Sequence, residues 1–109
     1  VMGATAARNA LTDAGIDYKL VEQAYAGYVY GDSCSGQAAL YQVGITGIPI
    51  YNVNNNCASG SSAFALAVQA VEGGTVDCAI AVGFEEMSPG AIDMIMFRMF
   101  FFSKSVSAP

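Results

Sequence analysis

Residues 77–84 contain an unbroken apolar run, Cys78-Ala-Ile-Ala-Val82, and this run constrains the fold more than any other feature. A strand that faces water on one side alternates apolar and polar residues, whereas a strand covered on both faces reads as a continuous apolar stretch. We therefore expect residues 77–84 to form a strand of a mostly parallel sheet, with helices on both faces.

The rest of the chain alternates helix-like and strand-like segments, as a layered α/β fold requires. Alanines spaced three and four apart predict a helix over residues 2–14, with Gly15 as its stop. Residues 58–72 are small or apolar nearly all round, which predicts a helix buried on every side. We also expect a capped turn at residues 17–22, strands at residues 24–30 and 48–53, and a short helix at residues 36–43.

Composition and charge limit the classes of protein that this chain can represent. With 109 residues it is at most one small domain, and its 54% hydrophobic and 12% charged content is rich in apolar residues for that size. We therefore expect a piece of a larger structure or a subunit buried in an oligomer, and the first residue, Val1, favours a fragment. The net charge of −5, with four basic residues, argues against a nucleic-acid partner.

Neither a membrane span nor a disulfide framework is expected. The longest apolar run near the end, residues 92–102, is interrupted by Asp93 and Arg98 and is shorter than the ~20 residues that a spanning helix needs. The three cysteines lie far apart without C-x-x-C spacing, so we expect no disulfide framework, no metal site and a reducing compartment. These features predict a soluble, intracellular protein.

Cys57 is the residue best placed for chemistry. It follows an apolar extended stretch and precedes a small-residue helix, whose N–H groups and positive dipole end would favour the thiolate. The residues around it are small or asparagine, which leaves room for a substrate and suits a tight turn. The same position also suits a small buried cysteine at a strand–helix junction, and the residues alone leave both interpretations open.

Other candidates have ordinary structural explanations. Cys34 lies in a polar turn and is either a second reactive thiol or an incidental loop cysteine, whereas Cys78 belongs to an apolar strand and is expected in the core. Asp32, Glu85 and Glu86 could act as acids or bases, but turn and surface roles suit their positions. The six tyrosines are expected to be packing residues.

Several motifs, in order and at consistent spacing, carry a family resemblance. The segment Asn54-Asn-Asn-Cys-Ala-Ser-Gly60 resembles the nucleophile segment of the thiolase superfamily, and Gly47-Ile-Pro-Ile-Tyr-Asn-Val-Asn-Asn-Asn-Cys57 is similar to thiolases of the sterol carrier protein X type. Gly27-Tyr-Val-Tyr-Gly-Asp-Ser33 and Asp77-Cys-Ala-Ile-Ala-Val-Gly-Phe-Glu-Glu-Met-Ser88 resemble flanking motifs of that group. The resemblance covers residues 1–91.

The resemblance implies an α/β fold, part of the N-terminal half of the layered αβαβα thiolase fold, in a dimer or tetramer. It implies an acyltransferase that cleaves 3-oxoacyl-CoA with branched or sterol-derived chains, with coenzyme A as co-substrate and no resident cofactor. Carried over, Cys57 is the nucleophile, and Met87 and Ser59 are candidates for contact with the substrate. The compartment implied is the cytoplasm in a bacterium and the peroxisome in a eukaryote.

This sequence also departs from the family pattern. Members of the family use a histidine and a second cysteine from the C-terminal half, and this chain contains no histidine. We therefore expect residues 1–91 to be a partial thiolase N-terminal domain without turnover, and residues 92–109 to be a tail without family resemblance. Residues 92–103 form an apolar cluster, and its exposure would predict aggregation. A thiolase-like aldolase subunit and a non-catalytic lipid-transfer or assembly protein remain as alternatives.

Overall fold

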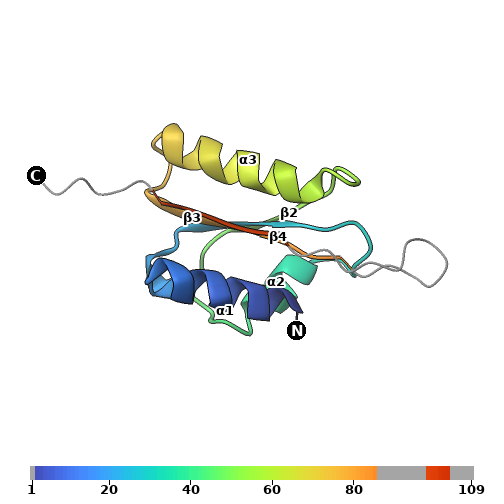
Figure 1. Ribbon diagram of the computed structural model, residues 1–109, viewed down its shortest axis with the longest axis horizontal. Helices are drawn as coiled ribbons and strands as arrows, with labels where there is room; N and C mark the ends of the chain where they lie inside the picture. The colour runs from blue at the N-terminus through green and yellow to red at the C-terminus, as the bar shows by residue number, and fades with distance from the viewer. Residues whose placement is uncertain (1, 86–97, 104–109) are drawn as a thin grey trace, which may run out of the picture.

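A four-stranded sheet with helices on both faces forms the structure, a computed structural model that describes residues 2–85 and 98–103 (Figure 1). Strands β1 (Gln23–Gly27), β2 (Ile50–Val53) and β3 (Cys78–Gly83) run parallel, in the spatial order β2-β1-β3. Strand β4 (Arg98–Ser103) pairs antiparallel with β3, so β2 and β4 form the edges of the described sheet. The predicted layered, mostly parallel α/β fold is confirmed.

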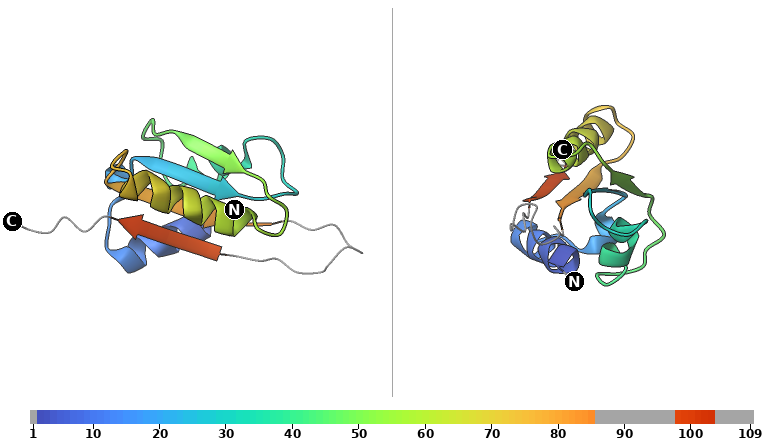
Figure 2. Two further views of the ribbon diagram at one scale, coloured as in Figure 1. Left: turned by 90° about the horizontal axis from the view of Figure 1, so that it is seen from above. Right: turned by 90° about the vertical axis from the view of Figure 1, so that its right-hand side faces the viewer.

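Each connection between parallel strands crosses a different face of the sheet. Helices α1 (Met2–Ala14) and α2 (Ser35–Leu40) cover one face, and α3 (Ser59–Glu72) covers the other (Figures 1 and 2). The chain therefore leaves β1 toward the face of α2 and leaves β2 toward the face of α3. The carboxyl ends of β1 and β2, which are neighbours, thus send the chain in opposite directions.

Strand β3 is buried along its whole length because its side chains enter two cores. Cys78, Ile80 and Val82 pack with Leu11 and Leu40 on the side of α1 and α2. The alternate residues are alanines, which pack against alanines of α3 in the second core: Ala79 and Ala81 of the strand with Ala63, Ala67 and Ala70 of the helix. The small side chains let the helix axis approach the sheet closely, so the two-sided burial expected from the apolar run is confirmed.

Local signals in the sequence set several element ends. Helix α1 has the predicted bounds, and Gly15 follows it with φ +68°, a left-handed conformation that suits glycine. The turn expected at residues 17–22 contains the short helix η1 (Tyr18–Leu20), and the Asp17 carboxylate accepts from the Lys19 amide at 3.0 Å. None of the helices among the described residues is long and apolar enough to cross a bilayer.

Several predicted segments are shorter in the structure than in the sequence analysis. The strand expected at residues 48–53 begins at Ile50. The strand expected to reach residue 30 ends at Gly27, because the amides of Val29 and Tyr30 bond to the Glu85 carboxylate instead of a neighbouring strand. The helix expected over residues 36–43 ends at Leu40, after which the chain forms a turn.

The prediction that residues 58–72 are buried on every side is wrong. Ala63 and Ala67 of α3 are completely buried, but Ala65 and Gln69 are exposed and the Leu66 side chain is 37% exposed. Among the described residues the sheet covers only one face of this helix, so an apolar composition all round did not produce burial all round.

The division at residue 91 falls outside the described residues and stays a prediction. Of the apolar cluster expected at residues 92–103, residues 98–103 form β4, and the remainder also lies outside the described part of the chain.

Candidate active site

The turn that carries Cys57 joins the carboxyl end of β2 to the amino end of α3. In parallel sheets, ligands bind beyond the carboxyl ends of the strands, at points where neighbouring strands send the chain to opposite faces. Strands β1 and β2 form such a point, and Asn54 is the first residue beyond β2. The fold therefore places Cys57 at the edge of the sheet where function is expected.

Asparagines fold the turn before Cys57. The Asn56 amide donates to the Asn54 side-chain oxygen at 3.1 Å, and the Ala58 amide donates to the Asn55 carbonyl at 3.0 Å. Asn56 has φ +49°, a left-handed conformation that asparagine tolerates and that β-branched residues resist. These contacts give a physical reason for asparagines immediately before the thiol.

The buried Ser59 side chain stabilises the turn by hydrogen bonds to its backbone. It is the first residue of α3 and only 4% exposed, and its hydroxyl donates to the Asn56 carbonyl at 2.7 Å and accepts from the Asn55 amide at 2.8 Å. Both hydrogen-bonding directions of the hydroxyl are thus used inside the turn. Contact between Ser59 and a substrate stays a prediction. In the structure the Ser59 hydroxyl bonds the backbone of the turn that precedes Cys57.

Cys57 itself is a free, exposed thiol immediately before the amino end of α3. The N-cap residue, Ala58, offers no side-chain bond to the helix, so no side chain of the cap neutralises the positive end of its dipole. Because the thiol is exposed, the alternative that Cys57 is a buried core thiol is wrong.

The other two thiols take different positions. Cys78 is buried within β3, as predicted. Cys34 is exposed and precedes α2 with φ +61°, so it lies in a loop and belongs neither to the turn of Cys57 nor to the cores. Asp32 is exposed in the same loop, in the turn position expected for it.

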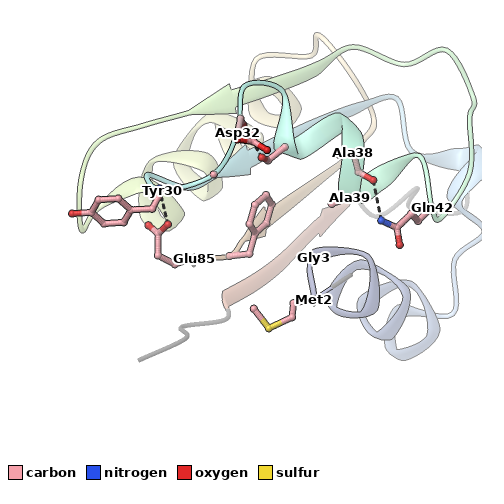
Figure 3. A pocket seen from close by; sticks show the side chains of 11 residues that line it. Met2, Gly3, Tyr30, Asp32, Ala38, Ala39, Gln42 and Glu85 are labelled. Carbon is pink, nitrogen blue, oxygen red and sulfur yellow. Dashed lines mark hydrogen bonds between the residues drawn. The ribbon is translucent and has the colours of Figure 1, made fainter. Parts of the chain in front are cut away.

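Two pockets lie near this edge of the sheet. The larger, about 400 Å³, is lined by residues of α1, α2 and the loop after β1, together with Glu85 (Figure 3). The smaller, about 220 Å³, lies between the loop at residues 28–33 and residues 52–54. The smaller pocket thus borders the turn that leads into Cys57.

Of the remaining candidates, the structure describes Glu85 but neither Glu86 nor Met87. Glu85 is half-buried and its carboxylate accepts two backbone amides, a role that sequence reasoning missed because the partners are 55 and 56 residues away. Met87 and Glu86 lie outside the described residues. In the described part of the chain, no group of three or more His, Cys, Asp or Glu side chains could hold a metal ion.

Relatives of known identity match most of the chain. Sterol carrier protein 2 of Gallus gallus is 59% identical over 88 residues, which are 80% of this chain and 16% of that protein. Non-specific lipid-transfer protein-like 2 of Caenorhabditis elegans is 50% identical over 88 residues, covering 81% of this chain and 21% of that protein. The chain therefore spans well under a third of the length of these two relatives.

Solved structures share the fold at lower identity. An OleA variant from Xanthomonas campestris matches 76% of this chain and 26% of its own, with a TM-score of 0.69 and 23% identity. The 3-oxoacyl-[acyl-carrier-protein] synthase III of Aquifex aeolicus matches 76% of this chain and 28% of its own, with a TM-score of 0.72 and 15% identity.

The family model for the thiolase N-terminal domain matches residues 1–99, eight residues past the boundary that the sequence motifs suggested. This match agrees with the fold shared with the solved structures. The chain belongs to the thiolase N-terminal domain family.

Proposed function

We propose that Cys57 is an acyl-accepting nucleophile and that this domain serves the thiolytic cleavage of 3-oxoacyl-CoA. The observation that carries the proposal is the position of Cys57, exposed at the amino end of α3 and at the carboxyl edge of the parallel strands. A thiolate is the nucleophilic form of cysteine, and a helix N-terminus beside it favours that form.

The chemistry proposed for Cys57 has two half-reactions. The thiolate attacks the 3-oxo carbon, the C2–C3 bond breaks, and its electron pair passes to C2, which takes a proton and leaves as acetyl-CoA or propanoyl-CoA. The shortened acyl group stays on the sulfur as a thioester. Free coenzyme A then attacks that thioester, and the Cys57 thiolate departs as the shortened acyl-CoA forms.

Turnover needs groups that this chain does not contain. The proton transfers of both half-reactions call for a general acid and base, worth ~10²–10⁴-fold each, and the sequence contains no histidine. We propose that a C-terminal half like that of the longer relatives supplies them. The exposed outer face of α3, which includes Leu66, is where we expect such a partner segment to cover the helix.

The acyl-transfer half-reaction can be tested on the chain as it stands. Acetyl-CoA should acetylate Cys57 by simple thioester exchange, which mass spectrometry detects. Cys34 is an exposed thiol outside the turn and is the matched control, so the Cys34→Ser and Cys57→Ser variants each leave one exposed thiol, beside the buried Cys78. Iodoacetamide, which needs no acyl-binding site, corrects for the intrinsic reactivity of each sulfur.

We expect the ratio of acetylation rate to alkylation rate to be about tenfold higher for Cys57 than for Cys34, because an oriented thioester reacts faster. Equal ratios for the two thiols would contradict the proposal. In a longer protein that includes the C-terminal half, blocking Cys57 with iodoacetamide should abolish thiolysis. Full cleavage activity after blocking would favour the aldolase-like alternative.

Lipid transfer is a second candidate, favoured by the names of the two relatives described above. Binding of a fluorescent fatty acyl probe to the folded monomer, unchanged when Cys57 is alkylated, would support that candidate over acyl transfer.

A further inference from the structure

Glu85 joins two strand ends that are far apart in the sequence. It lies two residues beyond β3, and its two carboxylate oxygens accept from the backbone amides of Val29 at 3.0 Å and Tyr30 at 2.8 Å. Figure 3 shows the Glu85 side chain turned toward Tyr30. A carboxylate that accepts two backbone amides forms charge-assisted bonds, which are stronger than neutral ones.

The loop that Glu85 holds is braced at several further points. The Tyr28 ring stacks on Phe84 with centroids 5.1 Å apart, beside the ladder bond from the Phe84 amide to the Gly27 carbonyl. The Tyr28 hydroxyl donates to the Asp32 carbonyl at 2.8 Å and accepts from the Ser35 amide at 3.1 Å. The loop at residues 28–35 is therefore fixed by side chains as well as by its own backbone.

This loop faces the end of β2 and Asn54, the first residue of the turn that leads to Cys57, across the smaller pocket. Four loop residues lie on one side of this pocket of about 220 Å³, and three residues at the end of β2 lie on the other: Tyr28, Val29, Gly31 and Ser33 against Asn52, Val53 and Asn54. Tyr30 lines the larger pocket. The smaller pocket lies where β1 and β2 send the chain to opposite faces, the position in an open parallel sheet where ligands bind. A substrate thioester that reaches Cys57 past Asn54 would lie against the wall that Glu85 holds.

We propose that Glu85 is a positioning residue for acyl transfer, an inference that rests on the proposed function of Cys57. By holding the Val29 and Tyr30 amides, the carboxylate fixes the backbone of the loop and so the position of Val29, which lines the pocket against which the thioester lies. Cys57 is held separately, through the bonds of Ser59 to Asn55 and Asn56. Loss of the carboxylate should therefore slow reaction with a thioester while leaving the reactivity of the thiol toward a small reagent unchanged.

The experiment compares two substitutions at Glu85 with a matched control, all in the Cys34→Ser chain. Glu85→Gln keeps one acceptor for the two amides, and Glu85→Ala keeps none. The control is Glu22→Gln, because Glu22 also bonds a backbone amide, that of Asp77 at 3.2 Å, at the opposite end of β3. Acetylation by acetyl-CoA, alkylation by iodoacetamide and hydrogen exchange of the Val29 and Tyr30 amides are measured for each variant.

We expect acetylation of Cys57 to fall about tenfold in Glu85→Ala and by a smaller factor in Glu85→Gln, with alkylation within about twofold of the unsubstituted chain. Exchange at Val29 and Tyr30 should rise in the same order. Glu22→Gln should change none of these rates. Tyr28→Phe removes the two hydrogen bonds of the Tyr28 hydroxyl within the same loop. It should reduce acetylation and raise amide exchange about as much as Glu85→Gln does, and it replaces Glu85→Ala in the comparison if that variant fails to fold.

The outcomes separate the two proposals. Acetylation at the unsubstituted rate in Glu85→Gln and Tyr28→Phe would overturn the role of Glu85 and leave the function of Cys57 intact. A parallel fall in acetylation and alkylation would show a general loss of structure and would also overturn it. If the unsubstituted chain is alkylated at Cys57 but shows no acetylation above the Cys34 control, the proposed function fails and the role of Glu85 fails with it.

Discussion

Gly27 and Ser59 approach so closely that a Cβ atom on Gly27 would lie 2.4 Å from the Ser59 carbonyl oxygen. The obstacle is backbone, which cannot rotate away as a flexible side chain can. The last residue of β1 must therefore be glycine if the first turn of α3 is to rest on the sheet. Since Cys57 lies immediately before that turn, the contact fixes the distance of the thiol from the edge of the sheet.

The substitution Gly27→Ala is expected to destabilise the domain by about 1–3 kcal/mol, the usual cost of forcing extra volume into a packed site. It should also displace α3 and reduce the acetylation of Cys57. Urea denaturation measures the first effect and mass spectrometry the second. Gly60→Ala is the control, because a Cβ there meets nothing within 4 Å, and it should be neutral or stabilising by up to ~1 kcal/mol.

The substitution Ser59→Ala is expected to cost about 1–3 kcal/mol, because the Asn55 amide loses its acceptor in a partly buried turn. Ser61→Ala, at an exposed position of the same helix, should change the free energy of unfolding by less than ~0.5 kcal/mol. Chemical denaturation of the two variants gives the comparison. A stable Ser59→Ala variant with impaired acetylation would instead assign this hydroxyl to the substrate.

The stability of variants at Asn56 should depend on how well the new residue tolerates the left-handed conformation there, φ +49°. Asn56→Gly is expected to be close to neutral, and Asn56→Val should destabilise by about 1–2 kcal/mol because a β-branched side chain clashes with its own backbone there. Denaturation of the series Gly, Asn, Val is the measurement. Equal stability of the glycine and valine variants would show that the turn adopts another conformation in solution.

The free energy of unfolding should decline at alkaline pH because two tyrosines, Tyr18 and Tyr25, have raised pKa values in the folded chain. Burial raises the pKa of Tyr18, and the neighbouring Tyr41 raises it by a smaller amount. Burial likewise raises the pKa of Tyr25, and the neighbouring Tyr51 makes the smaller contribution. A raised pKa in the folded state means that the neutral form is favoured there. The stabilisation is therefore complete below the ordinary tyrosine value of about 10 and is lost as the pH rises through the folded-state pKa.

The Tyr18→Phe variant should lose less stability than the unsubstituted chain as the pH rises above about 10. Urea denaturation at several alkaline pH values measures the slope. Tyr30→Phe, which removes an exposed hydroxyl, is the control and should leave the slope unchanged. A decline of the same steepness in Tyr18→Phe would show that other groups dominate the alkaline transition.

Several parts of the fold could be predicted because their signals are local. The alanine stripe of α1 and the unbroken apolar run of β3 each depend on spacing within one element, and both predictions are confirmed. The position of Cys57 between a strand and a helix was readable for the same reason, since the change of pattern at that residue marks the junction.

Other parts could not be predicted because they depend on contacts between distant segments. The exposure of Leu66 follows from which face of α3 meets the sheet, and an apolar sequence all round carries no information about that. The role of Glu85 requires the ends of β1 and β3 to be neighbours, and nothing in the residues around it indicates an amide 55 residues away as a partner.

The sequence by itself determined the approximate positions of helix α1 and strand β3, that Cys57 lies between a strand and a helix, and that the chain resembles thiolases, because periodicity, small residues and motif order are properties of neighbouring positions. Only the tertiary structure decided that Cys57 is exposed, that Ser59 supports the turn from beneath and that Glu85 fixes the opposing loop. Each of these depends on which strand ends the parallel sheet brings together, and that follows from packing across the whole domain.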